Sequence, residues 1–156
     1  MEYRKRRKGD PITEATIDFW QRLGMDSVAT LTFNENRRST PRSYRAVSEV
    51  VTKFLMKQGV KGPVSGVVEP HADGRLHCHI AYVSGETKHR DLHDAWYHSC
   101  GLSEIHPAEP HACKTCTREN CGDQRVGGGC HDFEYIARKM TNDGPRGDRY
   151  IERTIR

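Results

Sequence analysis

The sequence predicts an α+β domain in which helices flank a mainly antiparallel β-sheet. The first observation is a hairpin signal, since apolar and β-branched residues lie on both sides of Asp73-Gly74 across residues 64–83. The second is a pair of segments with apolar residues at helical spacing, residues 43–57 before the hairpin and residues 88–100 after it. The third is a short strand-like segment outside each of those helices. Two helical crossovers onto one sheet are typical of a ferredoxin-like or RRM-like plait, which is the architecture we expect.

The elements before the hairpin follow from composition and spacing. Residues 13–23 should form a helix that ends at Gly24, and residues 28–33 should form a strand because they are rich in β-branched residues. Residues 43–57 should form an amphipathic helix that ends at Gly59. The expected apolar stripe of the first helix is Ile12, Ala15, Phe19 and Leu23, and that of the second is Tyr44, Val47, Val50, Val51, Phe54 and Leu55.

The elements after the hairpin are two helices and a strand. Residues 88–100 should form a helix that covers the sheet and ends at Gly101, and residues 102–107 should form a short strand. Residues 131–140 should form a helix, because their apolar residues recur at positions i, i+3, i+4 and i+7. The covering residues of the first helix are Leu92, Ala95 and Trp96, and those of the second are Phe133, Ile136, Ala137 and Met140.

The bulk properties limit the class of protein. A chain of 156 residues is expected to form a single domain over residues 1–156, although 35% hydrophobic residues and a mean hydropathy of −0.82 make it polar for its size. No apolar run approaches the roughly 18 residues of a membrane span. The N-terminus is basic over residues 4–8, and no apolar signal-peptide core follows it. We therefore expect a cytoplasmic protein without membrane contact, in which disulfides are rare.

The second strand of the hairpin carries two histidines. His77 and His79 are two residues apart, so both imidazoles should lie on the same face of the sheet and form a pair of metal ligands. Glu69 precedes the turn and should lie opposite His77, where its carboxylate could supply a third ligand. His71 shares that face and is the alternative third ligand. Two histidines and one carboxylate leave coordination positions open, which suits a catalytic metal.

A cysteine-rich insert covers residues 111–130. Its four cysteines follow the pattern C-x2-C-x4-C-x8-C, and four thiolates can close a tetrahedral zinc shell. The segment has almost no apolar residues, so a metal would supply the free energy that orders it. His111 or His131 could replace one cysteine, and the alternatives to zinc are a reduced loop or disulfide pairing. The expected structural zinc ligands are Cys113, Cys116, Cys121 and Cys130.

Basic residues are clustered along a chain whose formal net charge is +4 and whose isoelectric point is near 8.8. Clustered lysines and arginines fit contacts with the phosphates of a nucleic acid. The loop that carries Arg37, Arg38 and Arg42 is the one that we expect to grip DNA, and the alternative is a solvated surface loop.

Tyr135 lies beside the apolar stripe of the last expected helix. Arg138 and Lys139 follow three and four residues later and are therefore its neighbours on the helix surface. A phenol with a pKa near 10 is a poor nucleophile at neutral pH. A nearby cation and a metal-polarised phosphate would make its attack feasible.

These pieces together resemble the HUH endonucleases. The resemblance is carried by His77-Cys78-His79 with Glu69 eight residues upstream, by Thr30-Leu31-Thr32-Phe33, and by Tyr135 with a basic residue on the following turn. The branch that fits is the single-tyrosine rolling-circle replication initiators of small plasmids and single-stranded DNA viruses, whose fold is the plait expected above. The third motif of that family usually reads Tyr-x-x-Lys, whereas here Arg138 holds the fourth position and Lys139 follows it.

The resemblance implies a site-specific endonuclease that cleaves and rejoins single-stranded DNA. Tyr135 would attack the scissile phosphate and leave a 5′-phosphotyrosine and a free 3′-OH, while Arg138 or Lys139 would stabilise the developing charge. The implied partners are single-stranded DNA at a replication origin and a host or separate helicase, in the cytoplasm of a bacterial or archaeal cell. The implied ligands of a catalytic Mg²⁺ or Mn²⁺ are Glu69, His77 and His79.

Other functions share parts of this pattern. A transposase or a plasmid-mobilisation relaxase would use the same chemistry on a different DNA. A zinc-stabilised module that binds nucleic acid without activity would keep the insert and the basic clusters, and it would form no covalent adduct with DNA.

Overall fold

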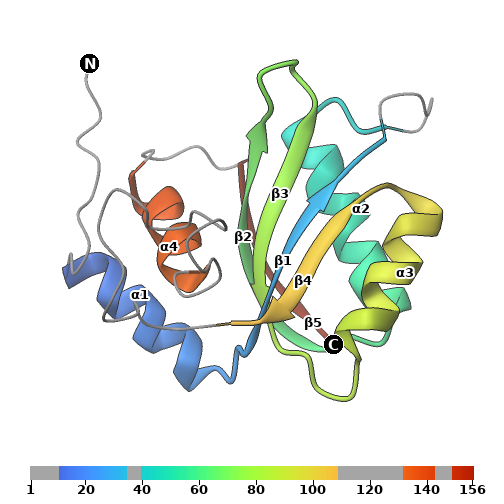
Figure 1. Ribbon diagram of the computed structural model, residues 1–156. Helices are drawn as coiled ribbons and strands as arrows, with labels where there is room; N and C mark the ends of the chain where they lie inside the picture. Colours follow the sequence, from blue (N-terminus) through green and yellow to red (C-terminus); the bar gives the residue numbers. More distant parts are fainter. Residues whose placement is uncertain (1–10, 35–39, 109–131, 143–148) are drawn as a thin grey trace.

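The computed structural model describes residues 11–34, 40–108, 132–142 and 149–156, and it has an α+β fold. The described strands form a five-stranded sheet in the order β4-β1-β3-β2-β5, and every neighbouring pair is antiparallel (Figure 1). The first four strands have the arrangement of the expected plait, so the predicted fold class is confirmed. The strands are β1 (Ser27–Thr32), β2 (Gly62–Pro70), β3 (Leu76–Tyr82), β4 (Ser103–Pro107) and β5 (Tyr150–Ile155).

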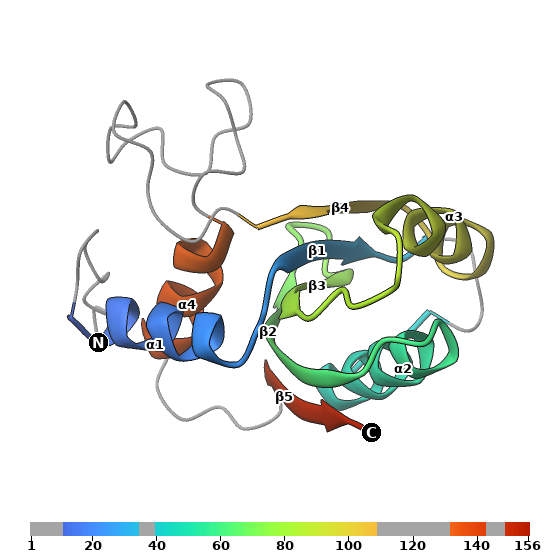
Figure 2. The ribbon, with the colours of Figure 1, turned by 90° about the horizontal axis from the view of Figure 1, so that it is seen from below.

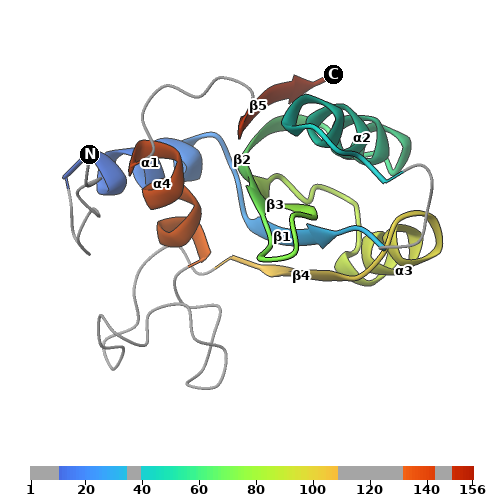
Figure 3. The same cartoon turned by 90° about the horizontal axis from the view of Figure 1, so that it is seen from above.

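Helices cover both faces of the sheet. In Figures 2 and 3, α2 and α3 lie on one face, and α1 and α4 lie on the other. Each face has its own core of buried residues, one centred on Trp96 and Leu55 under α2 and α3, the other on Phe133 and Trp20 under α1 and α4. The helices are α1 (Pro11–Arg22), α2 (Tyr44–Lys57), α3 (His89–Ser99) and α4 (Asp132–Asn142).

Local signals explain why α2 and the hairpin form where they do. Ser43 caps α2 by accepting a 3.1 Å hydrogen bond from the backbone N–H of Ala46, and Gly59 adopts a φ of 84° just past its end. In the hairpin, Gly74 has a φ of 89°, and Asp73 accepts a 3.0 Å hydrogen bond from the backbone N–H of Arg75. These contacts hold the connection between β2 and β3.

The predicted apolar stripe of α1 is wrong. Ile12, Phe19 and Leu23 are 50%, 58% and 39% exposed, whereas the buried residues of the helix are Thr13, Ile17 and Trp20. The reason is that α1 packs against α4, where the rings of Trp20 and Phe133 meet edge to face with centroids 5.8 Å apart. The helix is therefore rotated relative to the orientation that its most apolar spacing predicted.

The strand β5 was not predicted. It pairs with β2 along the edge of the sheet, from Gly62↔Ile155 to Val67↔Tyr150. Ile151 and Ile155 are buried in the core on the α2 face. Polar residues at 152–154 separate these two isoleucines in the sequence and obscure the alternation typical of a strand.

Candidate active site

The hairpin of β2 and β3 places three predicted metal ligands next to each other. Glu69 pairs with His77 across the two strands, as expected from the turn position. His79 lies two residues after His77, so its ring occupies the same face of the sheet, while Cys78 is fully buried on the opposite face. All three side chains are nearly covered, with 14%, 11% and 17% exposed for Glu69, His77 and His79.

The ligand atoms of these residues are close enough to share one metal ion. The two Nε2 atoms of His77 and His79 are 3.2 Å apart, and Glu69 Oε2 lies 3.7 Å from the first and 3.5 Å from the second. Two ligand atoms bound at about 2.1 Å to an octahedral ion would lie about 3 Å apart. The residues Glu69, His77 and His79 therefore form a group that could hold a metal ion.

Further contacts orient the two imidazoles. Thr30 on β1 pairs with His79, and its Oγ1 lies 3.0 Å from His79 Nδ1. This contact leaves His79 Nε2 directed at His77 and Glu69, as expected for a ligand whose second nitrogen is held by a neighbour. His77 Nδ1 is buried and has no hydrogen-bond partner among the described residues.

His71, the alternative third ligand, has a different position. Its ring stacks on that of His77 with centroids 4.0 Å apart and an interplanar angle of 24°. Among the described residues, the group of donor atoms within 4.8 Å of one another contains Glu69 and not His71. His71 therefore packs against one ligand of the group.

Tyr135 on α4 reaches the same group from above the sheet. Its hydroxyl donates a 3.3 Å hydrogen bond to Glu69 Oε2, and its ring contacts that of His79 with centroids 5.1 Å apart. Lys139, one turn further along α4, places Nζ 3.5 Å from Glu69 Oε1 and 5.6 Å from the centre of the Tyr135 ring. The helix spacing predicted both neighbours of Tyr135, and the structure directs Lys139 toward the carboxylate.

The electrostatics of the site follow from burial and close charges. Burial favours protonation of Glu69, but the hydrogen bond from His79 and the charge of Lys139 outweigh it and lower the pKa of Glu69 to about 2. Burial and the charges of His79 and His71 lower the pKa of His77 to about 4, so this ring is neutral at neutral pH. Burial and the negative charge of Glu69 raise the pKa of Tyr135 to about 12.

Several predicted site residues lie outside the described residues. These are the four cysteines of the insert, both of its alternative histidine ligands, and two arginines of the basic loop. Arg42, the third arginine of that loop, is exposed just before α2. The residues outside the description are Cys113, Cys116, Cys121, Cys130, His111, His131, Arg37 and Arg38.

One contact of the site was missed from the sequence. Thr30 belongs to a segment that the sequence resemblance singled out, yet no role followed from its position in the chain. The register of β1 against β3 decides that Thr30, and not Thr32, lies beside His79. That register depends on pairing between strands 49 residues apart.

The site lies within a segment that is shared with a known protein family. Residues 26–143 match the family described as replication-associated protein ORF2. The chain belongs to this family. The match spans β1 to the last turn of α4, so it includes all the side chains of the candidate site.

The remaining comparisons add nothing to this membership of the replication-associated family. Neither a curated protein nor a solved structure matches the chain. Within the part of the chain that the structure describes, no helix has the length and apolar character needed to cross a membrane.

Proposed function

We propose that this replication-associated protein is a metal-dependent, site-specific endonuclease of the HUH type that nicks and rejoins single-stranded DNA to initiate rolling-circle replication of a plasmid or a single-stranded DNA virus. The observation that carries the proposal is the position of the Tyr135 hydroxyl, 3.3 Å from Glu69 Oε2 and beside two imidazoles. A nucleophile next to a group of metal ligands is the constellation that phosphoryl transfer requires. Membership of the family supports replication over transposition or plasmid mobilisation.

The covalent step would exchange one phosphoester for another. The Tyr135 oxygen forms a bond to the scissile phosphorus as its proton passes to solvent, and the bond from that phosphorus to the 3′ oxygen breaks. The departing 3′ oxygen takes up a proton, which leaves a 3′-OH and a 5′-phosphotyrosine. Because the phosphodiester energy is retained in the tyrosyl ester, the reverse reaction can rejoin the strand.

Each side chain of the site would have a distinct role. Glu69, His77 and His79 would hold a Mg²⁺ or Mn²⁺ ion. When bound, such an ion supplies positive charge that polarises the scissile phosphate.

Glu69 would also orient the nucleophile. The pKa of Glu69 is about 2 and that of Tyr135 is about 12, so the carboxylate is too weak a base to remove the phenol proton. Its hydrogen bond therefore fixes the direction of the hydroxyl. Lys139 would stabilise negative charge that develops on the phosphate.

The proposal is tested by forming the covalent adduct. The protein is incubated with a randomised single-stranded DNA library and Mn²⁺, and a protein–DNA band is sought on a denaturing gel. Tyr135→Phe should abolish the band while single-stranded DNA binding remains, because only the attacking oxygen is lost. Tyr97→Phe, an exposed tyrosine on α3, is the matched control and should keep the band. An adduct that survives Tyr135→Phe would contradict the proposal and direct attention to Tyr150.

The metal assignment is tested separately by titration calorimetry with Mn²⁺. His79→Ala should remove measurable Mn²⁺ binding and cleavage together, because it deletes one of three ligands. His98→Ala, on the exposed side of α3, should change neither. Retained cleavage in His79→Ala would exclude the proposed site.

A further inference from the structure

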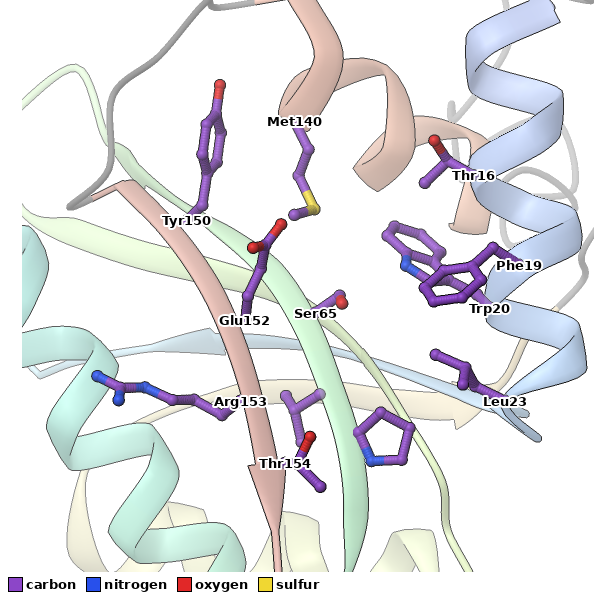
Figure 4. A pocket seen from close by; sticks show the side chains of 12 residues that line it. Thr16, Phe19, Trp20, Leu23, Ser65, Met140, Tyr150, Glu152, Arg153 and Thr154 are labelled. Atoms are coloured by element: carbon purple, nitrogen blue, oxygen red, sulfur yellow. The ribbon is translucent and has the colours of Figure 1, made fainter.

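A cleft of about 680 Å³ lies on the α1 and α4 face of the sheet, away from the candidate metal ligands. Figure 4 shows its parts: the Phe19 and Trp20 rings of α1 on one side, the Met140 thioether of α4 above, and the side chains of Ser65 and Glu152 along the strands. Its size is within the range of small-molecule sites in proteins.

The α1 wall of the cleft is apolar and exposed. Phe19 and Leu23 are 58% and 39% exposed, lie four residues apart on the helix, and both line the cleft. An exposed aromatic ring that borders a cleft offers a flat surface on which a planar ligand can stack.

The strand side of the cleft is polar. Ser65 on β2 and Glu152 on β5 are paired residues, so their side chains lie next to each other on this face. The Glu152 carboxylate points into the cleft beneath Met140 in Figure 4, whereas Arg153 points away. A carboxylate accepts hydrogen bonds only, and the exocyclic amines of cytosine and adenine are donors that fit it.

The cleft is continuous with the candidate active site through two elements. Ser65 and Glu69 are four residues apart on β2 and share a face, which separates them by about 13 Å. Met140 directly follows Lys139 on α4. A DNA strand held at Tyr135 can therefore reach the cleft within a few nucleotides.

The exposed charges around the cleft favour a polyanion over a second copy of the chain. Arg153 lines the cleft, Arg22 adjoins Leu23, and Lys61 lies two residues before Pro63, another lining residue. A two-fold interface would place this surface against itself and bring those cations together. A nucleotide would instead bring a phosphate toward them.

We propose that this cleft binds one base of the single-stranded DNA, with the base stacked on Phe19 and its exocyclic amine donating to Glu152. The proposal rests on the function proposed above and deepens it, since it assigns a base preference to a position a few nucleotides from the nick. Cytosine and adenine satisfy it, and thymine does not, because thymine has no exocyclic amine.

The test measures binding without cleavage, in the presence of a chelator, by fluorescence anisotropy with labelled oligo(dC), oligo(dA) and oligo(dT) of equal length. The wild-type chain should bind oligo(dC) and oligo(dA) more tightly than oligo(dT). Phe19→Ala should weaken binding to all three at least about fivefold, the effect of one lost stacking contact. Glu152→Val should remove the preference over oligo(dT). Tyr97→Ala, an equally exposed aromatic residue on α3, and Glu86→Ala should behave like the wild type.

A photocrosslink locates the base directly. An oligonucleotide with 5-iodo-deoxycytidine should crosslink to Phe19 or Tyr150, as read by mass spectrometry. Unchanged affinity in Phe19→Ala together with no crosslink in the cleft would overturn the proposal, even if the Tyr135 adduct forms normally. A wild-type dimer that Phe19→Ala dissociates would also overturn it in favour of a second copy. A crosslink in the cleft without any Tyr135 adduct would retain the cleft and reject the nuclease.

Discussion

The Tyr135 hydroxyl donates a 3.3 Å hydrogen bond to Glu69 Oε2 and so joins α4 to the hairpin across 66 positions of the chain. The same carboxylate lies 3.7 and 3.5 Å from the Nε2 atoms of His77 and His79. Glu69 is therefore the side chain through which the candidate nucleophile and the candidate metal ligands are held together.

Lys139, more than Arg138, should assist the reaction. Its Nζ lies 3.5 Å from Glu69 Oε1, on the side of α4 that faces the metal ligands. Lys139→Ala should slow adduct formation by roughly 100-fold, in the range found for the loss of one charge-stabilising donor. Arg138→Ala should slow it by less than about tenfold, and Lys57→Ala, at the end of α2, should have no effect. Single-turnover gels measure these rates, and a larger loss for Arg138→Ala would reverse the assignment.

Thr30 should act as a positioning residue for His79. Its Oγ1 lies 3.0 Å from His79 Nδ1, and loss of such a partner typically weakens metal binding by about 10- to 100-fold. Thr30→Val should lower the Mn²⁺ affinity in calorimetry by that factor, and Thr30→Ser should restore it. Thr32→Val is the control, since the Thr32 hydroxyl donates to the Leu102 carbonyl instead. Equal affinities for Thr30→Val and Thr30→Ser would show that the hydroxyl has no role.

Gly66 should not tolerate a side chain. A Cβ at this position would lie 2.2 Å from the His79 carbonyl oxygen and 2.8 Å from Ile80 Cγ2, so β2 and β3 would have to separate. Gly66→Ala should lower the free energy of unfolding by about 3 kcal/mol, at the upper end for overpacking. Gly85→Ala, where a Cβ meets no atom within 4 Å, should cost about 1 kcal/mol through its φ of 55°. Urea denaturation measures both, and equal costs would contradict the predicted clash.

The metal-free protein should lose stability in mild acid through His77. Burial and its histidine neighbours lower the pKa of His77 from 6.5 to about 4, so the folded state disfavours the proton that the unfolded chain accepts. The contribution is complete above pH 6.5 and is lost as the pH falls toward 4, by up to roughly 3 kcal/mol. Urea denaturation with a chelator at pH 7 and pH 5 measures this loss.

His77→Gln should flatten that pH dependence because it removes the titrating ring. His98→Gln, a change on the exposed side of α3, should leave the slope as in the wild type. Identical slopes for the wild type and His77→Gln would assign the acid sensitivity to other groups.

The cysteine-rich insert, which lies outside the described residues, should bind one structural zinc ion. Native mass spectrometry should find one tightly held zinc, and Cys116→Ser should weaken it because one of four thiolates is removed. Cys100→Ser, a half-buried cysteine at the end of α3, should retain the metal. A protein without zinc and with free thiols at Cys113, Cys116, Cys121 and Cys130 would contradict the prediction.

Much of the site could be predicted because it is built on one hairpin. The spacing of His77 and His79 sets both rings on one face, and the Asp73-Gly74 turn brings Glu69 opposite His77. These relations need only the two-residue period of a strand and the position of a turn. They depend on contacts between residues close together in the chain, which is why the sequence was sufficient.

The wrong and missing predictions concern contacts between distant segments. Apolar residues lie all around α1, and the Trp20–Phe133 contact with α4, rather than the most regular spacing, decides which side is buried. The strand β5 has charged residues at its centre, and it forms because the free edge of β2 offers unpaired backbone groups. Neither contact can be inferred from local periodicity.

The sequence by itself determined the order of the plait, the histidine pair, its carboxylate partner and the helix that carries Tyr135. These follow from local periodicities and turn signals. Only the tertiary structure decided that α4 lies on the histidine face of the sheet, that Lys139 points toward Glu69, and that Thr30 contacts His79. The physical reason is that these contacts depend on how two hydrophobic cores pack α1 and α4 on one face of the sheet and α2 and α3 on the other.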